Sequence, residues 1–152
     1  MFSKKLLCAI TCAIAFSTSP LMAHDGATGV VKERMDLMKI VGKNTKAIAP
    51  IAMGSAEMNL KAVEEAATAI SNAAKEAVTK FPEDSHTKES GAKIEIWAKW
   101  DEFAGLMKSL ETDSAKLAAM AKAGEEFELI DGFNKMISNC KNCHTKFRNK
   151  KD

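Results

Sequence analysis

Four long stretches of the chain carry apolar residues at the three- and four-residue spacing of an α-helix, and this pattern limits the fold more than any other feature. The stretches cover residues 30–49, 59–81, 94–123 and 126–148. Pro50, Pro82 and Gly124 follow the first three, where helix ends are expected. No run of alternating apolar and polar residues indicates a strand. Because the connections are short, the sequence predicts an all-α fold, an antiparallel up-down-up-down four-helix bundle.

The same spacing predicts which side chains the helices bury. The first helix should end at Ala49, because the residue before a proline is disfavoured in the helical region. The third should run without a break from residue 94 to residue 123, with Trp97 and Phe103 on its apolar side. The inner face of the fourth helix is predicted to carry Phe127, Ile130, Phe133, Ile137 and Phe147.

The first 23 residues have the pattern of a secretory signal peptide. Lys4 and Lys5 precede an apolar run over residues 6–16, and cleavage is expected after Ala23. An uncleaved membrane anchor is the alternative, but about a dozen apolar residues fall short of the roughly 20 that span a bilayer. We therefore expect residues 1–23 to be removed and residues 24–152 to form one domain in the periplasm, without a membrane anchor.

A C-x-x-C-H motif, Cys140 to His144, lies near the end of the chain and is typical of covalent haem c attachment. On a helix, thiols three positions apart project from the same side, so Cys140 and Cys143 can form thioethers with two vinyl groups on one porphyrin edge. His144 lies four positions after Cys140 and shares that face, so its imidazole can bind the iron. The motif predicts one haem c per chain.

Three other roles of this cysteine pair are weaker. A disulfide between Cys140 and Cys143 would close a very small loop and stabilise little. A thioredoxin-like pair would need a strand leading into the start of a helix, whereas this pair lies late in a predicted helix. A zinc site usually needs four ligands, and residues 24–152 contain no second cysteine pair.

The motif and its flanks resemble the class II c-type cytochromes, the cytochrome c′ family. Cys140 to His144 together with Phe147 and Arg148 is similar to the family's terminal C-x-x-C-H-x-x-[aromatic]-R. Residues 30–39 are similar to the family's opening helix, and Ile96-Trp97 resembles a pair at the start of its third helix. The resemblance covers essentially all of residues 24–152. It implies the bundle fold that is known for this family.

The resemblance also implies which residues contact the haem. In gas-binding cytochromes c′ an apolar residue covers the distal iron face and leaves the iron five-coordinate, whereas in low-spin relatives a methionine occupies that place and binds the iron. Aligning Lys32 and Arg34 with the family's basic pair places Met38 at the distal position. The resemblance thus predicts His144 and Met38 as iron ligands and Arg34 as a partner of a haem propionate, as in the low-spin branch.

Alternatives to Met38 stay open at the level of sequence. Met35 lies three residues earlier on an adjoining part of the helix surface, and Met53 and Met58 follow that helix. The iron could also have no sixth protein ligand. Glu33 occupies a position where the family often has an aromatic residue, which weakens the match to the high-spin branch.

The predicted function is that of a soluble periplasmic electron-transfer protein that carries one electron on its haem and meets redox partner proteins. A methionine ligand raises the reduction potential of haem iron, which suits this role. The alternative is five-coordinate binding of nitric oxide or carbon monoxide. No enzymatic activity is expected. Residues 24–152 carry 20 basic and 20 acidic side chains, so no basic excess indicates nucleic-acid binding. Members of the family are often dimers, which makes a homodimer a further implication.

Overall fold

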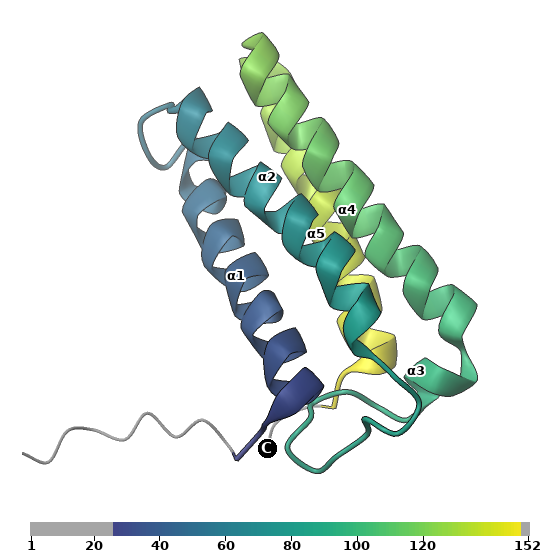
Figure 1. Cartoon of the computed structure of the whole chain (residues 1–152). Coiled ribbons are helices and arrows are strands. Elements are labelled where there is room, and N and C mark those ends of the chain that lie inside the picture. Colours follow the sequence, from purple (N-terminus) through teal and green to yellow (C-terminus); the bar gives the residue numbers. More distant parts are fainter. Residues whose placement is uncertain (1–25, 150–152) are drawn as a thin grey trace, which may run out of the picture.

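The computed structural model describes residues 26–149, and within them four long helices lie side by side (Figure 1). The predicted signal peptide and its cleavage after Ala23 fall outside this range. The helices are α1 (Gly29–Ala52), α2 (Leu60–Ala77), α4 (Trp100–Ala123) and α5 (Leu129–Phe147). The chain runs along them in alternating directions, which confirms the predicted up-down-up-down bundle. No helix in the described range is long and apolar enough to cross a membrane.

The helices pack in chain order around one core. α2 packs against α1 and α4, and α4 packs against α5, whereas α1 and α5 touch each other only sparsely. Each long helix contributes at least one fully buried side chain: Ile48, Ile70, Leu117 and Met136. The inner face of α2 is rich in alanine, so its neighbours can approach its backbone closely. Because α1 and α5 make few direct contacts, their relative position depends largely on the other segments that pack against both of them.

Pro50 does not end the first helix, contrary to the prediction. α1 continues to Ala52, and the amide of Met53 donates to the carbonyl oxygen of Ala49 at 3.0 Å. The proline removes the one hydrogen bond that its own amide would make, but its carbonyl oxygen accepts from the amides of Ser55 and Ala56, both at 2.9 Å, beyond the helix end. The helix ends at Ala52, and Gly54, two residues further on, has a φ of 69°, in the left-handed region that glycine adopts without strain.

The third predicted helix is broken in two, which also differs from the prediction. The short helix α3 (Glu95–Ala98) is separated from α4 by Lys99, whose φ of −128° and ψ of 45° are not helical. The break lets α3 bury Ile96 while the indole nitrogen of Trp97 donates to the carbonyl oxygens of Phe81 and Pro82, at 3.1 and 2.9 Å. No proline or glycine marks the break, so the local sequence does not reveal it.

The start of the fourth predicted helix is a 3₁₀ turn, η2 (Glu126–Glu128), and α5 begins only at Leu129. The prediction that Phe127 and Ile130 face the core is wrong, because their side chains are 94% and 38% exposed. A 3₁₀ turn has three residues per turn, so it rotates Phe127 away from the apolar stripe of α5. Phe133 and Phe147 are buried as predicted.

A second 3₁₀ turn, η1 (Val78–Lys80), ends α2 and leads into the connection over residues 81–94. This connection crosses the end of the bundle where α1 begins and α5 ends (Figure 1). An isolated β-bridge pairs Ala92 with Arg148, just beyond the end of α5. Two hydrogen bonds flank this bridge, from the Lys93 amide to the Phe147 carbonyl oxygen (2.9 Å) and from the Asn149 amide to the Gly91 carbonyl oxygen (2.8 Å). The connection is therefore attached to the end of α5.

Candidate haem-binding site

The C-x-x-C-H motif lies in the last turns of α5, and its two thiols face the bundle. Cys140 and Cys143 are half-buried and pack against the apolar core, as free thiols. Burial raises the pKa of Cys140, and burial together with the charge of Cys140 raises the pKa of Cys143 to about 11. Both are therefore neutral thiols near neutral pH. Two half-buried thiols on one helix face are a donor set that fits a covalently attached porphyrin.

His144 lies at the outer side of the same helix and is exposed to solvent. Partial burial of the ring, and then the positive charge of Arg148, lower the pKa of its imidazole. A lowered pKa favours the neutral imidazole, which is the form that ligates iron. The structure thus places the two thiols inward and the proposed iron ligand outward, one helical turn after Cys140.

A polar contact holds this part of α5 against α4. Asn139, the residue before Cys140, is buried, and its side-chain amide donates to a carboxylate oxygen of Asp113 in α4 at 2.9 Å. The same carboxylate lies 3.6 Å from the ammonium group of Lys135. A partly buried hydrogen bond of this kind opposes sliding of one helix along the other. The local sequence does not reveal it, because the two residues belong to different helices.

Met38 lies in α1 at the same end of the bundle as the motif. At 1.5 Å per residue, Met38 is about 14 Å from the start of α1 and Cys140 about 10 Å from the end of α5. These two helix ends lie at one end of the bundle (Figure 1). The Met38 side chain is half-buried and packs against the core, whereas Met53 is 64% exposed and Met58 is 39% exposed at the α1–α2 turn. Met35 is half-buried.

Asp36, which lies between Met35 and Met38, forms ion pairs along α1 with Lys32 and Lys39. Their hydrogen bonds to the carboxylate lower the pKa of Asp36 from 3.8 to about 2. The ionised carboxylate of Asp36 therefore stabilises α1 at pH values above the ordinary aspartate pKa. This contribution is lost as the pH falls toward 2.

We expect an NMR titration to find the Asp36 carboxyl midpoint near 2, and a higher midpoint in Lys32→Ala. Lys61→Ala is the matched control, since Lys61 makes an exposed ion pair with Glu65 at the same four-residue spacing in α2. The control should leave the Asp36 midpoint unchanged. An ordinary Asp36 midpoint in the wild-type protein would contradict the ion-pair arrangement.

Arg34, the predicted partner of a haem propionate, is only 3% exposed and is bonded to the connection that follows α2. One terminal nitrogen donates to the carbonyl oxygen of Lys80 (3.2 Å) and the hydroxyl of Ser85 (2.8 Å). The other donates to the carbonyl oxygen of Ser85 and the hydroxyl of Ser90, both at 2.7 Å. A propionate would have to bind at Nε or replace one of these bonds. Burial lowers the pKa of Arg34.

Aromatic rings fill the end of the bundle beside Arg34. Its guanidinium carbon lies 4.7 Å from the centre of the Phe81 ring, which is close enough for a cation–π contact. The Phe81 ring is 4.7 Å from that of Phe103, which in turn lies 5.6 Å from that of Phe147. Trp97 lies 6.2 Å from Phe81. These rings form an apolar cluster that includes Phe147, three residues after the haem motif in the sequence.

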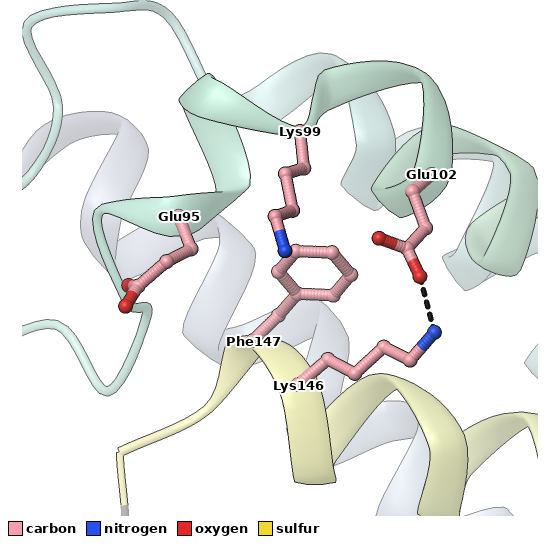
Figure 2. Close-up of a pocket in the computed structure, with 5 residues that line it drawn as sticks. All are labelled: Glu95, Lys99, Glu102, Lys146 and Phe147. Atoms are coloured by element: carbon pink, nitrogen blue, oxygen red, sulfur yellow. Dashed lines mark hydrogen bonds and ion pairs between the residues drawn. The ribbon is translucent and has the colours of Figure 1, made fainter.

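A cavity of about 290 Å³ also lies at this end, but its lining does not include the cysteine pair (Figure 2). It is lined by Glu95, Lys99, Glu102, Lys146 and Phe147. Figure 2 shows the ion pair between Lys146 and Glu102 beside the Phe147 ring. This contact ties the last turn of α5 to the first turn of α4. Because most of the lining is charged, the cavity does not suit the apolar faces of a porphyrin.

An antiparallel four-helix bundle with C-x-x-C-H on its last helix defines a c-type cytochrome of class II. The sequence profile of the family described as "Cytochrome C'" matches residues 29–148. Cytochrome c′ of Rhodopseudomonas palustris is 32% identical over 125 residues, which cover 82% of this chain and 84% of that protein. Cytochrome c-556 of Agrobacterium fabrum is 30% identical, with the same coverage.

Solved structures show the same fold. Structures of cytochrome c prime from Alcaligenes xylosoxidans, one of the ferric protein and one a nitric oxide complex of a variant, superpose with a TM-score of 0.74 at 22% identity. They cover 80% of this chain and 94% of theirs. The chain therefore belongs to the cytochrome c′ family. It carries one haem c, attached covalently through Cys140 and Cys143.

The comparisons do not support the narrower prediction of a low-spin branch with a methionine ligand. Cytochromes c′ typically hold a five-coordinate, high-spin haem, so the family assignment favours the gas-binding alternative over the electron carrier. The roles predicted for His144, Met38 and Arg34 stay predictions.

Proposed function

We propose that the protein binds nitric oxide or carbon monoxide at the haem face next to Met38, with His144 as the iron ligand on the other face. Membership of the cytochrome c′ family carries the proposal. The apolar character of α1 at this level supports it, because Leu37, Met38 and Val41 are buried or half-buried there. Arg34, one helical turn before Met38, is held by hydrogen bonds to Ser85 and Ser90. An apolar distal side suits a small neutral ligand and disfavours peroxidase-like chemistry.

The protein's own residues then have distinct tasks. Cys140 and Cys143 would hold the porphyrin through thioethers, and the neutral imidazole of His144 would ligate the iron. Met38 would cover the gas-binding site and limit the entry of water. Arg34 is a proposed partner of a propionate. The iron supplies the site that binds the gas. We further propose that the protein acts in the periplasm without enzymatic activity, after removal of residues 1–23, and that it forms a homodimer.

Electron transfer is the second candidate, because the side chain at the distal position is a methionine. A thioether is a soft ligand that stabilises ferrous iron, and Met38 is held against the core rather than free in solvent. If Met38 bound the iron, the haem would be six-coordinate and low-spin, and the protein would exchange an electron with redox partner proteins.

The optical and electron paramagnetic resonance spectra of the ferric protein separate the two functions. We expect a high-spin, five-coordinate spectrum and rapid binding of carbon monoxide by the ferrous form. Met38→Ala should raise the rate of carbon monoxide association by about tenfold, equivalent to about 1.4 kcal/mol of activation free energy. Met35→Ala, three residues earlier on α1, is the matched control and should leave that rate unchanged.

A low-spin ferric spectrum in the wild-type protein would overturn the gas-binding proposal. If Met38→Leu then converts the spectrum to high-spin, the protein is a His144/Met38 electron carrier. If the low-spin spectrum persists in Met38→Leu and disappears in Met35→Leu, Met35 is the ligand instead.

A further inference from the structure

The connection over residues 81–94 is hydrogen-bonded to α1 through Arg34 and to the end of α5 through Phe147. α1 and α5 touch each other sparsely, although α1 carries Met38 and α5 carries the haem motif. Between their ends lies Ser90, which is buried and only 7% exposed. The spacing of α1 and α5 at this end therefore depends on what Ser90 and its neighbours bond to.

Ser90 forms hydrogen bonds both to α1 and to the segment that pairs with the end of α5. Its hydroxyl oxygen accepts a hydrogen bond from Arg34 of α1 at 2.7 Å and another from the amide of Ala92 at 3.1 Å. Ala92 is the bridge partner of Arg148, and the flanking Lys93 amide donates to the carbonyl oxygen of Phe147 at 2.9 Å. One buried hydroxyl thus links the guanidinium of α1 to the backbone that is paired with the end of α5.

Ser85 provides a close comparison within the same connection. Its hydroxyl also accepts from Arg34, at 2.8 Å, and it donates to the carbonyl oxygen of Pro82 at 2.7 Å. Apart from Arg34, the Ser85 hydroxyl thus bonds only to the part of the connection that directly follows α2. Ser85 and Ser90 therefore bind the same guanidinium, but only the Ser90 hydroxyl also bonds to the segment that pairs with α5.

We propose that Ser90 is a positioning residue, whose hydroxyl sets the spacing between α1 and the haem-bearing end of α5 by bonding Arg34 and Ala92 together. The spacing determines how the residue at the distal position lies relative to the haem held by Cys140 and Cys143. The spectroscopic part of the test rests on the proposed place of Met38, whereas the hydrogen-exchange part does not. A failure of the proposed function is therefore distinguishable from a failure of this inference.

The test compares Ser90→Ala with Ser85→Ala in the holoprotein. Amide hydrogen exchange at Ala92, Lys93 and Asn149 should become at least about tenfold faster in Ser90→Ala and stay unchanged in Ser85→Ala. The ferric spectrum and the reduction potential should shift only in Ser90→Ala. Ser90→Thr retains the hydroxyl and should restore the wild-type values. Equal effects of the two alanine variants on exchange and spectrum would show that Ser90 is merely structural.

The wild-type holoprotein provides a second measurement, which is independent of whether Ser90→Ala folds. Because the Ser90 hydroxyl and the Ala92–Arg148 bridge form one connected set of bonds, the amides of Ala92, Lys93 and Asn149 should exchange together, as one cooperative unit. Exchange of the Ala92 amide at a rate unrelated to those of Lys93 and Asn149 would overturn the proposal.

Discussion

Replacing both Cys140 and Cys143 by alanine is expected to abolish covalent haem attachment completely. The two thiols are the only cysteines in the described part of the chain, and both face the bundle from the last turns of α5. Without them no side chain there can form a thioether with the porphyrin. The mass of the intact protein should then lack the haem, and a haem stain of a denaturing gel should be negative. Each single variant should retain one thioether and covalent haem.

Cys8 and Cys12 provide the matched control for this prediction. They lie within the predicted signal peptide, so replacing both by serine should leave the mass of the mature holoprotein unchanged. Covalent haem in the Cys140/Cys143 double variant would contradict the assignment of the motif. A mature mass that includes Cys8 and Cys12 would instead contradict cleavage after Ala23.

Arg34→Ala is expected to cause the largest loss of stability among side chains outside the apolar core. The substitution removes four hydrogen bonds, two to Ser85 and one each to Lys80 and Ser90, and leaves buried acceptors without a donor. Each buried group left unpaired costs about 1–3 kcal/mol, partly offset by relaxation of the connection. We expect a loss on the order of 3 kcal/mol, which lowers the melting temperature of a domain of this size by roughly 10 °C.

Two further variants show whether the geometry of the guanidinium matters. Arg34→Lys keeps the positive charge but cannot make the paired hydrogen bonds of a planar fork, so it should recover only part of the stability. Lys32→Ala removes an exposed charge from the same helix and should change the free energy of unfolding by less than about 1 kcal/mol. Thermal unfolding of the three holoproteins measures these differences. A melting temperature of Arg34→Ala equal to the wild-type value would contradict the role of this cluster.

The bundle and the haem motif could be predicted from the sequence because both depend on local periodicity. The three- and four-residue spacing of apolar residues indicates helices whatever their neighbours are, and short connections limit how such helices can be arranged. The spacing of Cys140, Cys143 and His144 places all three on neighbouring parts of one helix surface for the same reason. Such features need no knowledge of contacts between distant residues.

The errors occur where packing between elements outweighs a local preference. Pro50 lies inside α1, and its carbonyl oxygen accepts hydrogen bonds from the amides of Ser55 and Ala56 beyond the helix end. The helix break at Lys99 depends on Trp97, whose indole bonds to carbonyl oxygens at the end of the preceding connection. Phe127 is apolar but exposed, because the 3₁₀ turn before α5 points it away from the core.

By itself, the sequence determined the four-helix class of the fold and the covalent attachment point of the haem, and it predicts Met38 as the distal residue. Only the tertiary structure decided the partners of Arg34. Ser85 and Ser90 lie more than 50 residues away along the chain and belong to a segment that carries no periodic signal. A buried guanidinium bonds to whichever oxygens the folded chain brings to it, and that proximity is created by the packing of the helices rather than by any local pattern.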